Sequence, residues 1–257
     1  MESDSRKFLM ENRFENLLDW AKYLWIQAMD LLTIPIQVNS DQTITSLWSV
    51  PKDFTPGQTD AVILAHGAGN DMNHPFMVTY QQGLAQAGLL SITFNFPYKE
   101  LGRKAPDRPA LLLQTWNAVV QALKAHPSLH PRRLFLGGKS MGGRMASLAV
   151  AEGLPCDGLV FLGYPLHPPK QPEKARTDHW PQIGCPSLFI EGTRDSLCDL
   201  DLLHQNLSKL KGPSTLMTVE GGDHSFKTPK SLRTDPDTIH LEVIEKIRQW
   251  INDHPCE

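Results

Sequence analysis

The sequence predicts an α/β fold in which helices cover both faces of a mostly parallel sheet. Short apolar runs of strand length alternate along the 257-residue chain with longer segments of helical periodicity. The runs are continuously apolar, which is typical of strands that are buried on both faces. Strands and helices that follow one another in turn indicate a parallel sheet, and a chain of this length suffices for one such domain.

Residues 34–257 account for this domain, with eight predicted strands. The first two strands, 34–38 and 43–50, form a hairpin that turns at residues 39–41. The later strands are expected at residues 61–65, 89–94, 134–136, 158–162, 187–191 and 215–219. The helices are expected near residues 76–86, 110–125, 144–152, 200–209 and 238–253. This compact arrangement leaves no room for a large lid.

Residues 1–33 are expected to form an amphipathic helical extension ahead of the domain. Helical periodicity runs from about residue 7 to residue 32, and the apolar stripe consists of Phe14, Leu18, Ala21, Trp25, Ala28 and Leu32. A stripe this wide is not left in water, so it packs on the domain, on a second copy of the chain or on a membrane surface. The segment carries six acidic and four basic residues, which disfavours anionic lipid. Packing on the domain and a homodimer through this helix are the two expectations that remain.

Composition excludes several classes of protein. The formal net charge of -3 gives no reason to expect nucleic acid as a partner, and no run is long and apolar enough for stable membrane insertion. The four cysteines are scattered without a C-x-x-C pair, which favours free thiols in a reducing, cytoplasmic compartment. The histidines have no H-E-x-x-H or comparable spacing, so we expect neither a metal nor another cofactor.

The most informative motif is the G-x-S-x-G sequence around Ser140, within the glycine-rich residues 137–143. It follows the predicted strand 134–136 and precedes the predicted helix 144–152. A serine on a sharp strand-to-helix turn is the nucleophile elbow of α/β hydrolases. The glycines are required because a side chain beside the serine would collide with the neighbouring strand or helix. With this elbow after its fifth strand, the sheet is predicted to have the α/β-hydrolase fold.

A nucleophilic serine needs a histidine as base and a carboxylate that orients the histidine. In this fold the acid and then the histidine follow the serine, on loops after later strands. Asp195 comes just after the predicted strand 187–191, and His224 just after 215–219. Both positions place these side chains at the edge of the sheet that carries Ser140. We therefore predict Ser140, Asp195 and His224 as the catalytic residues.

Two other carboxylates compete with Asp195 for the acid. Asp223 is adjacent to His224, but neighbouring side chains diverge in extended backbone. Asp199 falls in or near the helix that follows the strand, where it points away from the strand end. Asp195 is the better choice.

The loop after the predicted strand 61–65 is expected to complete an oxyanion hole. Its two donors are the N–H of Met141, which follows the nucleophile, and the N–H of Ala68 in this early loop. His66 is expected to brace the loop by hydrogen bonding and to take no part in the chemistry. Lys139 is expected to face outward beside the elbow.

Substrate-binding residues are less well indicated. Tyr98 follows the predicted strand 89–94, and Tyr164 and His167 follow the strand 158–162, where their side chains could line a pocket. Other polar residues of the same two loops share this position: Arg103, Asp107, Arg108, Arg176 and His179.

These residues support a resemblance to a known family. From about residue 60 to residue 251 the chain resembles the small α/β hydrolases related to dienelactone hydrolase. It is most similar to the branch with the testis-expressed hydrolase-like proteins and the hydrolase-like domain of a chromatin acetyltransferase complex subunit. The stretches that carry the resemblance are 64–69, 94–98, 137–146, 161–169 and 191–195. The resemblance implies the same triad and the same two oxyanion donors. Dienelactone hydrolases have cysteine where this chain has Ser140, so their lactone specificity is not implied.

The sequence thus predicts a serine hydrolase of small, short-acyl esters, of the carboxylesterase class EC 3.1.1. A thioesterase or a peptidase is the alternative within the same chemistry. From a different class, the chain could be a non-catalytic interaction module that retained the elbow. An intact set of three residues in the correct order argues against that alternative.

Overall fold

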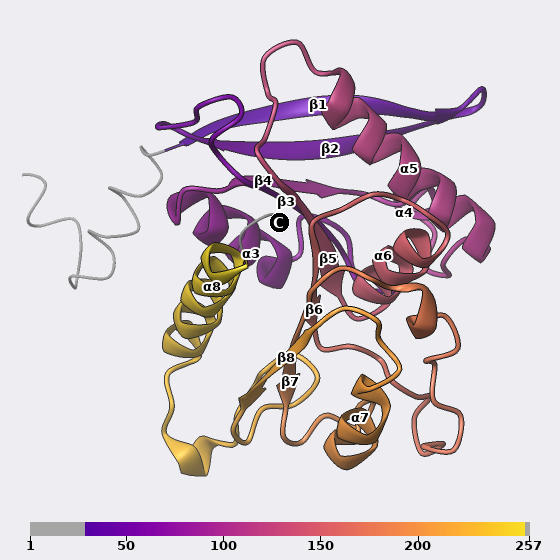
Figure 1. Cartoon of the computed structure of the whole chain (residues 1–257), viewed down its shortest axis with the longest axis vertical. Coiled ribbons are helices and arrows are strands. Elements are labelled where there is room, and N and C mark those ends of the chain that lie inside the picture. Colours follow the sequence, from indigo (N-terminus) through magenta and orange to yellow (C-terminus); the bar gives the residue numbers. More distant parts are fainter. Residues whose placement is uncertain (1–28, 255–257) are drawn as a thin grey trace, which may run out of the picture.

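The computed structural model describes residues 29–254 as one eight-stranded sheet with helices on both faces (Figure 1). The strands are β1 Met29–Asn39, β2 Gln42–Pro51, β3 Ala61–Ala65, β4 Leu90–Phe94, β5 Leu134–Lys139, β6 Gly158–Leu162, β7 Ser187–Gly192 and β8 Ser214–Val219. Their order across the sheet is β1-β2-β4-β3-β5-β6-β7-β8. The pairs β1·β2 and β2·β4 are antiparallel, and all later pairs are parallel. The carboxyl ends of β3 to β8 therefore lie along one edge.

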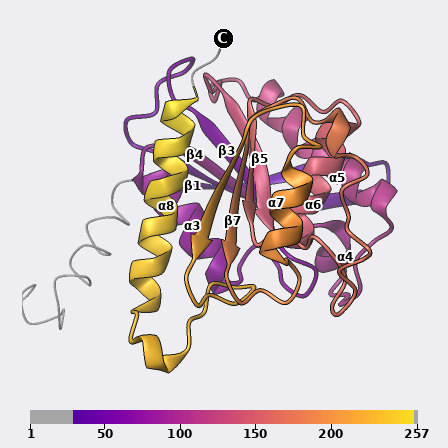
Figure 2. The ribbon, with the colours of Figure 1, turned by 60° about the horizontal axis from the view of Figure 1, so that its bottom comes forward.

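Helices cover the sheet in two groups, which separate clearly in Figure 2. The helices are α3 Pro75–Gln86, α4 Pro97–Glu100, α5 Pro109–Ala125, α6 Met141–Ala151, α7 Leu200–Leu207 and α8 Pro236–Asp253. The apolar side chains of α3 and α8 belong to one buried cluster, and those of α5, α6 and α7 belong to a second cluster on the opposite face.

Strand β5 shows how the sequence divides between the two faces. Leu134 and Leu136 pack in the cluster of α5 and α6, whereas Phe135 between them packs in the cluster of α3 and α8. Successive side chains of a strand point to opposite faces, so a strand covered on both sides must be apolar at every position. This is why the predicted strands read as continuous apolar runs.

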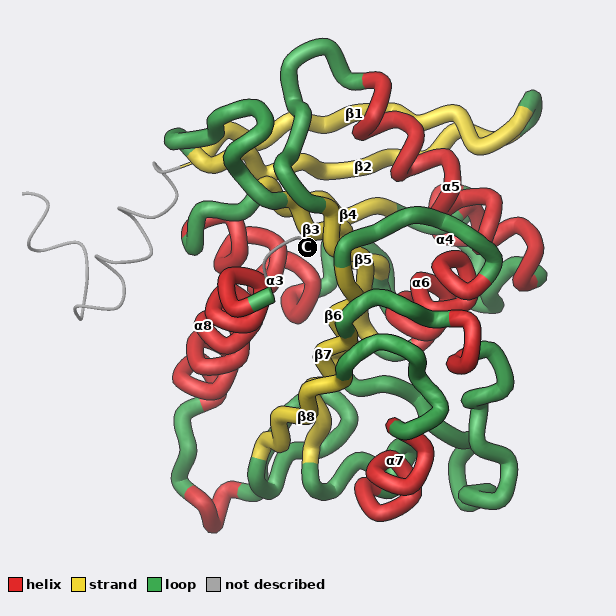
Figure 3. Tube along the Cα trace, in the orientation of Figure 1, coloured by secondary structure: helices red, strands yellow, loops and turns green. Residues whose placement is uncertain are grey.

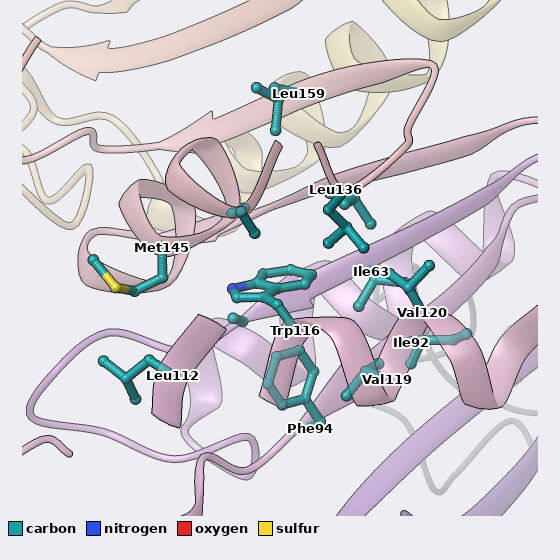
Figure 4. Packing of buried hydrophobic residues seen from close by; sticks show 14 of the residues in the cluster. Ile63, Ile92, Phe94, Leu112, Trp116, Val119, Val120, Leu136, Met145 and Leu159 are labelled. Carbon is teal, nitrogen blue, oxygen red and sulfur yellow. The ribbon is translucent and has the colours of Figure 1, made fainter. Parts of the chain in front are cut away.

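Trp116 of α5 belongs to the larger cluster and lies in the middle of the part of it that Figure 4 shows. Its side chain is fully buried, and its ring meets the Phe94 ring edge-on at 5.1 Å and 83°. Leu136 of β5 and Met145 of α6 lie around it in the same view. A large aromatic side chain in this place joins α5 to the strand and the helix that flank Ser140.

The predicted α/β architecture is confirmed, including the hairpin and the six later strands. The chain between β6 and β7 holds only the short helical turn η1, Trp180–Gln182, and is otherwise loop (Figure 3). Within residues 29–254 no large lid is inserted at this edge. No helix of the described segment is long and apolar enough to cross a membrane.

The predicted helical extension is wrong for residues 29–33. These residues form the start of β1, where Met29 pairs with Pro51 and Leu32 with Trp48 of β2. Long-range strand pairing therefore overrides the local helical periodicity. The rest of the predicted extension, residues 1–28, lies outside the described residues, and the homodimer through it stays a prediction.

The close approach of β5 to β6 leads to the first testable prediction. A Cβ added at Gly137 would overlap the main-chain carbonyl of Val160 in β6. We expect Gly137→Ala to lower the free energy of unfolding by about 3 kcal/mol, because two backbones must move apart. Urea unfolding followed by tryptophan fluorescence measures the change.

The matched control is Gly184→Ala, since a Cβ at Gly184 would have no neighbour within 4 Å. It should alter the free energy of unfolding by less than about 0.5 kcal/mol. Equal stability of the two variants would contradict the packing described for β5.

Candidate active site

Ser140 lies between the last residue of β5 and the first residue of α6. Its backbone has φ 53° and ψ -118°, a conformation that side chains rarely adopt. Its N–H donates to the Leu162 carbonyl of β6 at 3.2 Å. Two residues later, a Cβ at Gly142 would overlap the Ala65 carbonyl at the end of β3. The sharp turn is thus held between the carboxyl ends of β3 and β6, and it presents the Ser140 side chain at the edge.

The structure brings Ser140, His224 and Asp195 together from three different loops. His224 Nε2 lies 2.8 Å from Ser140 Oγ, and His224 Nδ1 lies 2.6 Å from Asp195 Oδ2. Asp195 Oδ1 accepts the N–H of Leu197 at 2.8 Å. The Asp195 side chain has no exposed surface, while 24% of the His224 side chain is exposed. With Nδ1–H directed at the carboxylate, Nε2 is free to accept the Ser140 proton.

The two competing carboxylates have other partners. Asp223 Oδ1 accepts the N–H groups of Ser225 and Lys227, at 2.7 and 3.0 Å, and so shapes the loop that carries His224. Asp199 caps α7 by accepting the Leu202 N–H at 2.9 Å. Of the three carboxylates considered from the sequence, only Asp195 is hydrogen-bonded to His224.

Two main-chain N–H groups near Ser140 are suited to an oxyanion. In the described part of the chain, neither Met141 N–H nor Ala68 N–H has a hydrogen-bond acceptor. Met141 is the first residue of α6, where the helix dipole adds positive potential. The Ala68 loop passes close to the serine, because a Cβ at Gly67 would lie 3.5 Å from Ser140 Cβ.

Two buried side chains support this loop from beneath. His66 Nδ1 donates to the Gly67 carbonyl at 2.8 Å, and His66 Nε2 accepts the Phe96 N–H at 3.2 Å. Burial lowers the pKa of His66 to about 4, so its ring is neutral and can serve both bonds. The Tyr98 hydroxyl donates to the Ala68 carbonyl at 2.9 Å. His66 and Tyr98 therefore hold the loop in place by hydrogen bonding, and this is the part expected for His66 from the sequence.

The side chains suggested for substrate binding are buried in this structure and form hydrogen bonds with the main chain of the loops. Tyr98 and Tyr164 are fully buried, and the Tyr164 hydroxyl donates to the Arg176 carbonyl at 3.1 Å. His167 Nε2 accepts the Asp199 N–H at 3.1 Å, and its side chain lies beside a surface hollow next to Asp195. Sequence position alone could not show that these loop side chains turn inward.

The outward orientation predicted for Lys139 is wrong. The residue is only 5% exposed, its Nζ donates to the main-chain carbonyl of His224, and Nζ lies 5.5 Å from the centre of the Phe76 ring. Burial lowers the pKa of Lys139 to about 8, although Asp195, Glu191 and Asp223 oppose the shift. The alternation of side chains along β5 could have predicted this burial, because Lys139 falls on the same face of the strand as the buried Phe135.

A sequence model of a family described as "alpha/beta hydrolase domain" matches residues 58–252. Dienelactone hydrolase from Anabaena variabilis has a similar structure, with a TM-score of 0.67 and 20% identity over 89% of this chain and 100% of that one. XC6422 from Xanthomonas campestris, described as an a/b serine hydrolase without lid, has a TM-score of 0.67 and 19% identity, over 89% of this chain and 97% of that one. Est1E from Butyrivibrio proteoclasticus has a TM-score of 0.65 and 18% identity, over 86% of this chain and 98% of that one. The predicted α/β-hydrolase fold is confirmed.

The buried Lys139 makes stability depend on pH. Its pKa of about 8 in the folded protein is below the ordinary value of 10.5. Between these values the unfolded chain holds a proton that the folded protein has lost, so the free energy of unfolding rises with pH. Lys139→Met lacks this contribution. We expect the stability of wild type relative to Lys139→Met to increase between pH 8 and 10, by at most about 1.4 kcal/mol per pH unit.

Urea unfolding at pH 7, 8.5 and 10 measures this difference. Lys124→Met, at an exposed position of α5, is the control and should show no such trend relative to wild type. A difference between wild type and Lys139→Met that is constant with pH would refute the buried, titrating ammonium.

Proposed function

Because the chain belongs to the alpha/beta hydrolase domain family, we propose that it is a serine hydrolase that cleaves small esters through an acyl-enzyme. The observation that carries this proposal is the hydrogen-bonded series from Ser140 Oγ through His224 to the buried Asp195. A serine is a weak nucleophile until a base in direct contact takes its proton.

In the proposed reaction, Ser140 Oγ attacks the ester carbonyl while His224 Nε2 removes its proton. Asp195 fixes the tautomer of His224 and stabilises the positive charge that the ring acquires. The N–H groups of Met141 and Ala68 donate to the oxyanion of the tetrahedral intermediate. His224 then protonates the leaving alcohol, and water, activated by the same ring, releases the acid from Ser140. The reaction requires no cofactor.

The ester class EC 3.1.1, with short acyl chains, is the substrate we favour. The absence of a large lid from residues 29–254 leaves little apolar surface to hold a long acyl chain. Structural neighbours include esterases, and Est1E has been crystallised with ferulic acid bound. Ser140 stands where dienelactone hydrolases carry cysteine, so we propose an ester and not a lactone. Within the family we place the chain with the testis-expressed hydrolase-like branch.

A thioesterase or peptidase would use the same residues and stays the alternative within this chemistry. A non-catalytic interaction module is disfavoured, because such a module has no need of a hydrogen-bonded serine, histidine and carboxylate. We also propose a cytoplasmic location, which is supported by the free thiols of Cys156 and Cys185, whose sulfur atoms lie 3.7 Å apart.

Ser140→Ala tests the nucleophile. We expect the variant to lose about 10⁶ in kcat on 4-nitrophenyl acetate, because no acyl-enzyme can form. A fluorophosphonate probe should label wild type and leave the variant unlabelled. Wild-type protein that neither cleaves the ester nor takes up the probe would refute the hydrolase proposal.

Asp195→Asn tests whether Asp195, and not Asp199 or Asp223, is the carboxylate that orients His224. It should lower kcat by about 10⁴, because an amide favours the wrong imidazole tautomer. Asp199→Asn and Asp223→Asn are the matched controls, since the side chain of each accepts main-chain N–H groups of its own helix or loop. Both should stay within about tenfold of wild type in the same assay. A larger loss for either control than for Asp195→Asn would assign the acid to that residue.

A further inference from the structure

Two arginines beside the elbow, Arg144 and Arg176, have no carboxylate partner among residues 29–254. The Nε atom of Arg144 is buried, and in the described residues it has no hydrogen-bond partner. None of the ion pairs within residues 29–254 includes Arg144 or Arg176. Arg176 makes one long hydrogen bond, from Nη1 to the Pro165 carbonyl at 3.4 Å. A guanidinium has five N–H donors, so most of the donors of both side chains have no protein acceptor among these residues.

Arg144 is placed close to the nucleophile by the geometry of α6. It follows Ser140 by four residues, and its N–H donates to the Ser140 carbonyl at 3.1 Å. Helical side chains lean toward the N-terminus of their helix. The N-terminus of α6 is the end that carries Ser140.

Arg176 is brought to the same place by the loop after β6. The Arg176 N–H donates to the Leu166 carbonyl at 2.7 Å, and its own carbonyl accepts the Tyr164 hydroxyl at 3.1 Å. Tyr164 stands two residues after Leu162, whose carbonyl accepts the Ser140 N–H. The loop thus folds back so that residue 176 lies at the end of β6, next to the elbow.

The two guanidinium groups repel one another. Burial and the charge of Arg144 lower the pKa of Arg176. The same two causes lower the pKa of His179 to about 4, so this ring adds no positive charge. His179 Nε2 lies 2.7 Å from Ser147 Oγ, which donates to the Arg144 carbonyl at 2.8 Å. His179 Nε2–H therefore donates to Ser147. Partly buried like charges and a buried donor without an acceptor are unfavourable, and a bound anion relieves both.

We propose that Arg144 and Arg176 form an anion subsite beside Ser140, and that the substrate is an ester that carries a carboxylate. This proposal rests on the proposed hydrolase function. Arginine forks match the geometry of a carboxylate, which accepts two parallel N–H bonds.

Matched ester pairs test the charge preference. One pair is 4-acetoxybenzoate and 4-acetoxybenzamide, which places the carboxylate on the leaving group. The other pair is mono-4-nitrophenyl glutarate and 4-nitrophenyl pentanoate, which places it on the acyl group. After the rate of each ester without enzyme is subtracted, including the attack of the glutarate carboxylate on its own ester, we expect wild type to prefer the anionic member of at least one pair by about tenfold in kcat/KM.

Variants assign that preference to the two arginines. Arg144→Gln and Arg176→Gln should each lower the anionic-to-neutral ratio of kcat/KM by about tenfold, and Arg144→Lys by less, because it keeps the charge without the fork. Arg248→Gln is the control, since Arg248 pairs with Glu245 on the outer face of α8. It should leave the ratio at the wild-type value. Ratios near one in both pairs, or ratios that neither Arg144→Gln nor Arg176→Gln changes, would overturn the subsite.

A binding measurement separates this proposal from the hydrolase proposal. In Ser140→Ala protein, benzoate should raise Tm while benzamide does not, and adding Arg144→Gln should abolish the shift. Wild type that takes up the fluorophosphonate but shows no charge preference would refute the subsite and leave the hydrolase proposal intact. Benzoate binding that depends on Arg144, in a protein that cleaves no ester, would support the subsite alone. A Tm shift with inorganic phosphate and none with benzoate would overturn the carboxylate assignment.

Discussion

The direct packing of backbone on backbone around residues 137–143 is the constraint on which the site depends. Side chains at Gly137 and Gly142 would overlap carbonyl groups of β6 and β3, so the elbow can exist only where these strands meet it without side chains. The same packing holds Ser140 at φ 53° and directs the N-terminus of α6 toward the serine. Because β7 and β8 continue the parallel sheet, the loops after them bring Asp195 and His224 to the same edge.

Buried polar side chains then fix the main chain of the site loops. His66 and Tyr98 hold the Ala68 loop by its carbonyl groups, and Lys139 holds the loop of His224 in the same way. Glu191 accepts the Tyr164 N–H at 2.6 Å, and complete burial raises the pKa of its carboxyl group well above the ordinary range. Each of these groups forms a hydrogen bond with the main chain of a site loop. Catalytic loops that are held this way do not have to reorganise as charge develops in the reaction.

The sequence predicted the sheet, the elbow and the position of Asp195 and His224 close to Ser140, because these follow from local periodicity and from the parallel topology. It failed where long-range packing decides the outcome. The apolar spacing of residues 29–32 is helical, but pairing with β2 makes them a strand. Lys139 was expected to face outward, although it is buried and its Nζ lies over the ring of Phe76 in α3. The inward turn of Tyr98 and Tyr164 depends on loop conformation, which periodicity does not encode.

In the proposed reaction, Ser140 Oγ bonds to the ester carbonyl carbon while the N–H groups of Met141 and Ala68 donate to the carbonyl oxygen. A crystal structure of the protein inactivated with a small phosphonate ester tests it most directly, because the phosphorus imitates the tetrahedral intermediate. We expect a bond from phosphorus to Ser140 Oγ, with the phosphoryl oxygen about 2.7–3.1 Å from the main-chain nitrogen atoms of Met141 and Ala68. Phosphorus bonded to another residue, or a phosphoryl oxygen directed away from Met141 and Ala68, would contradict it.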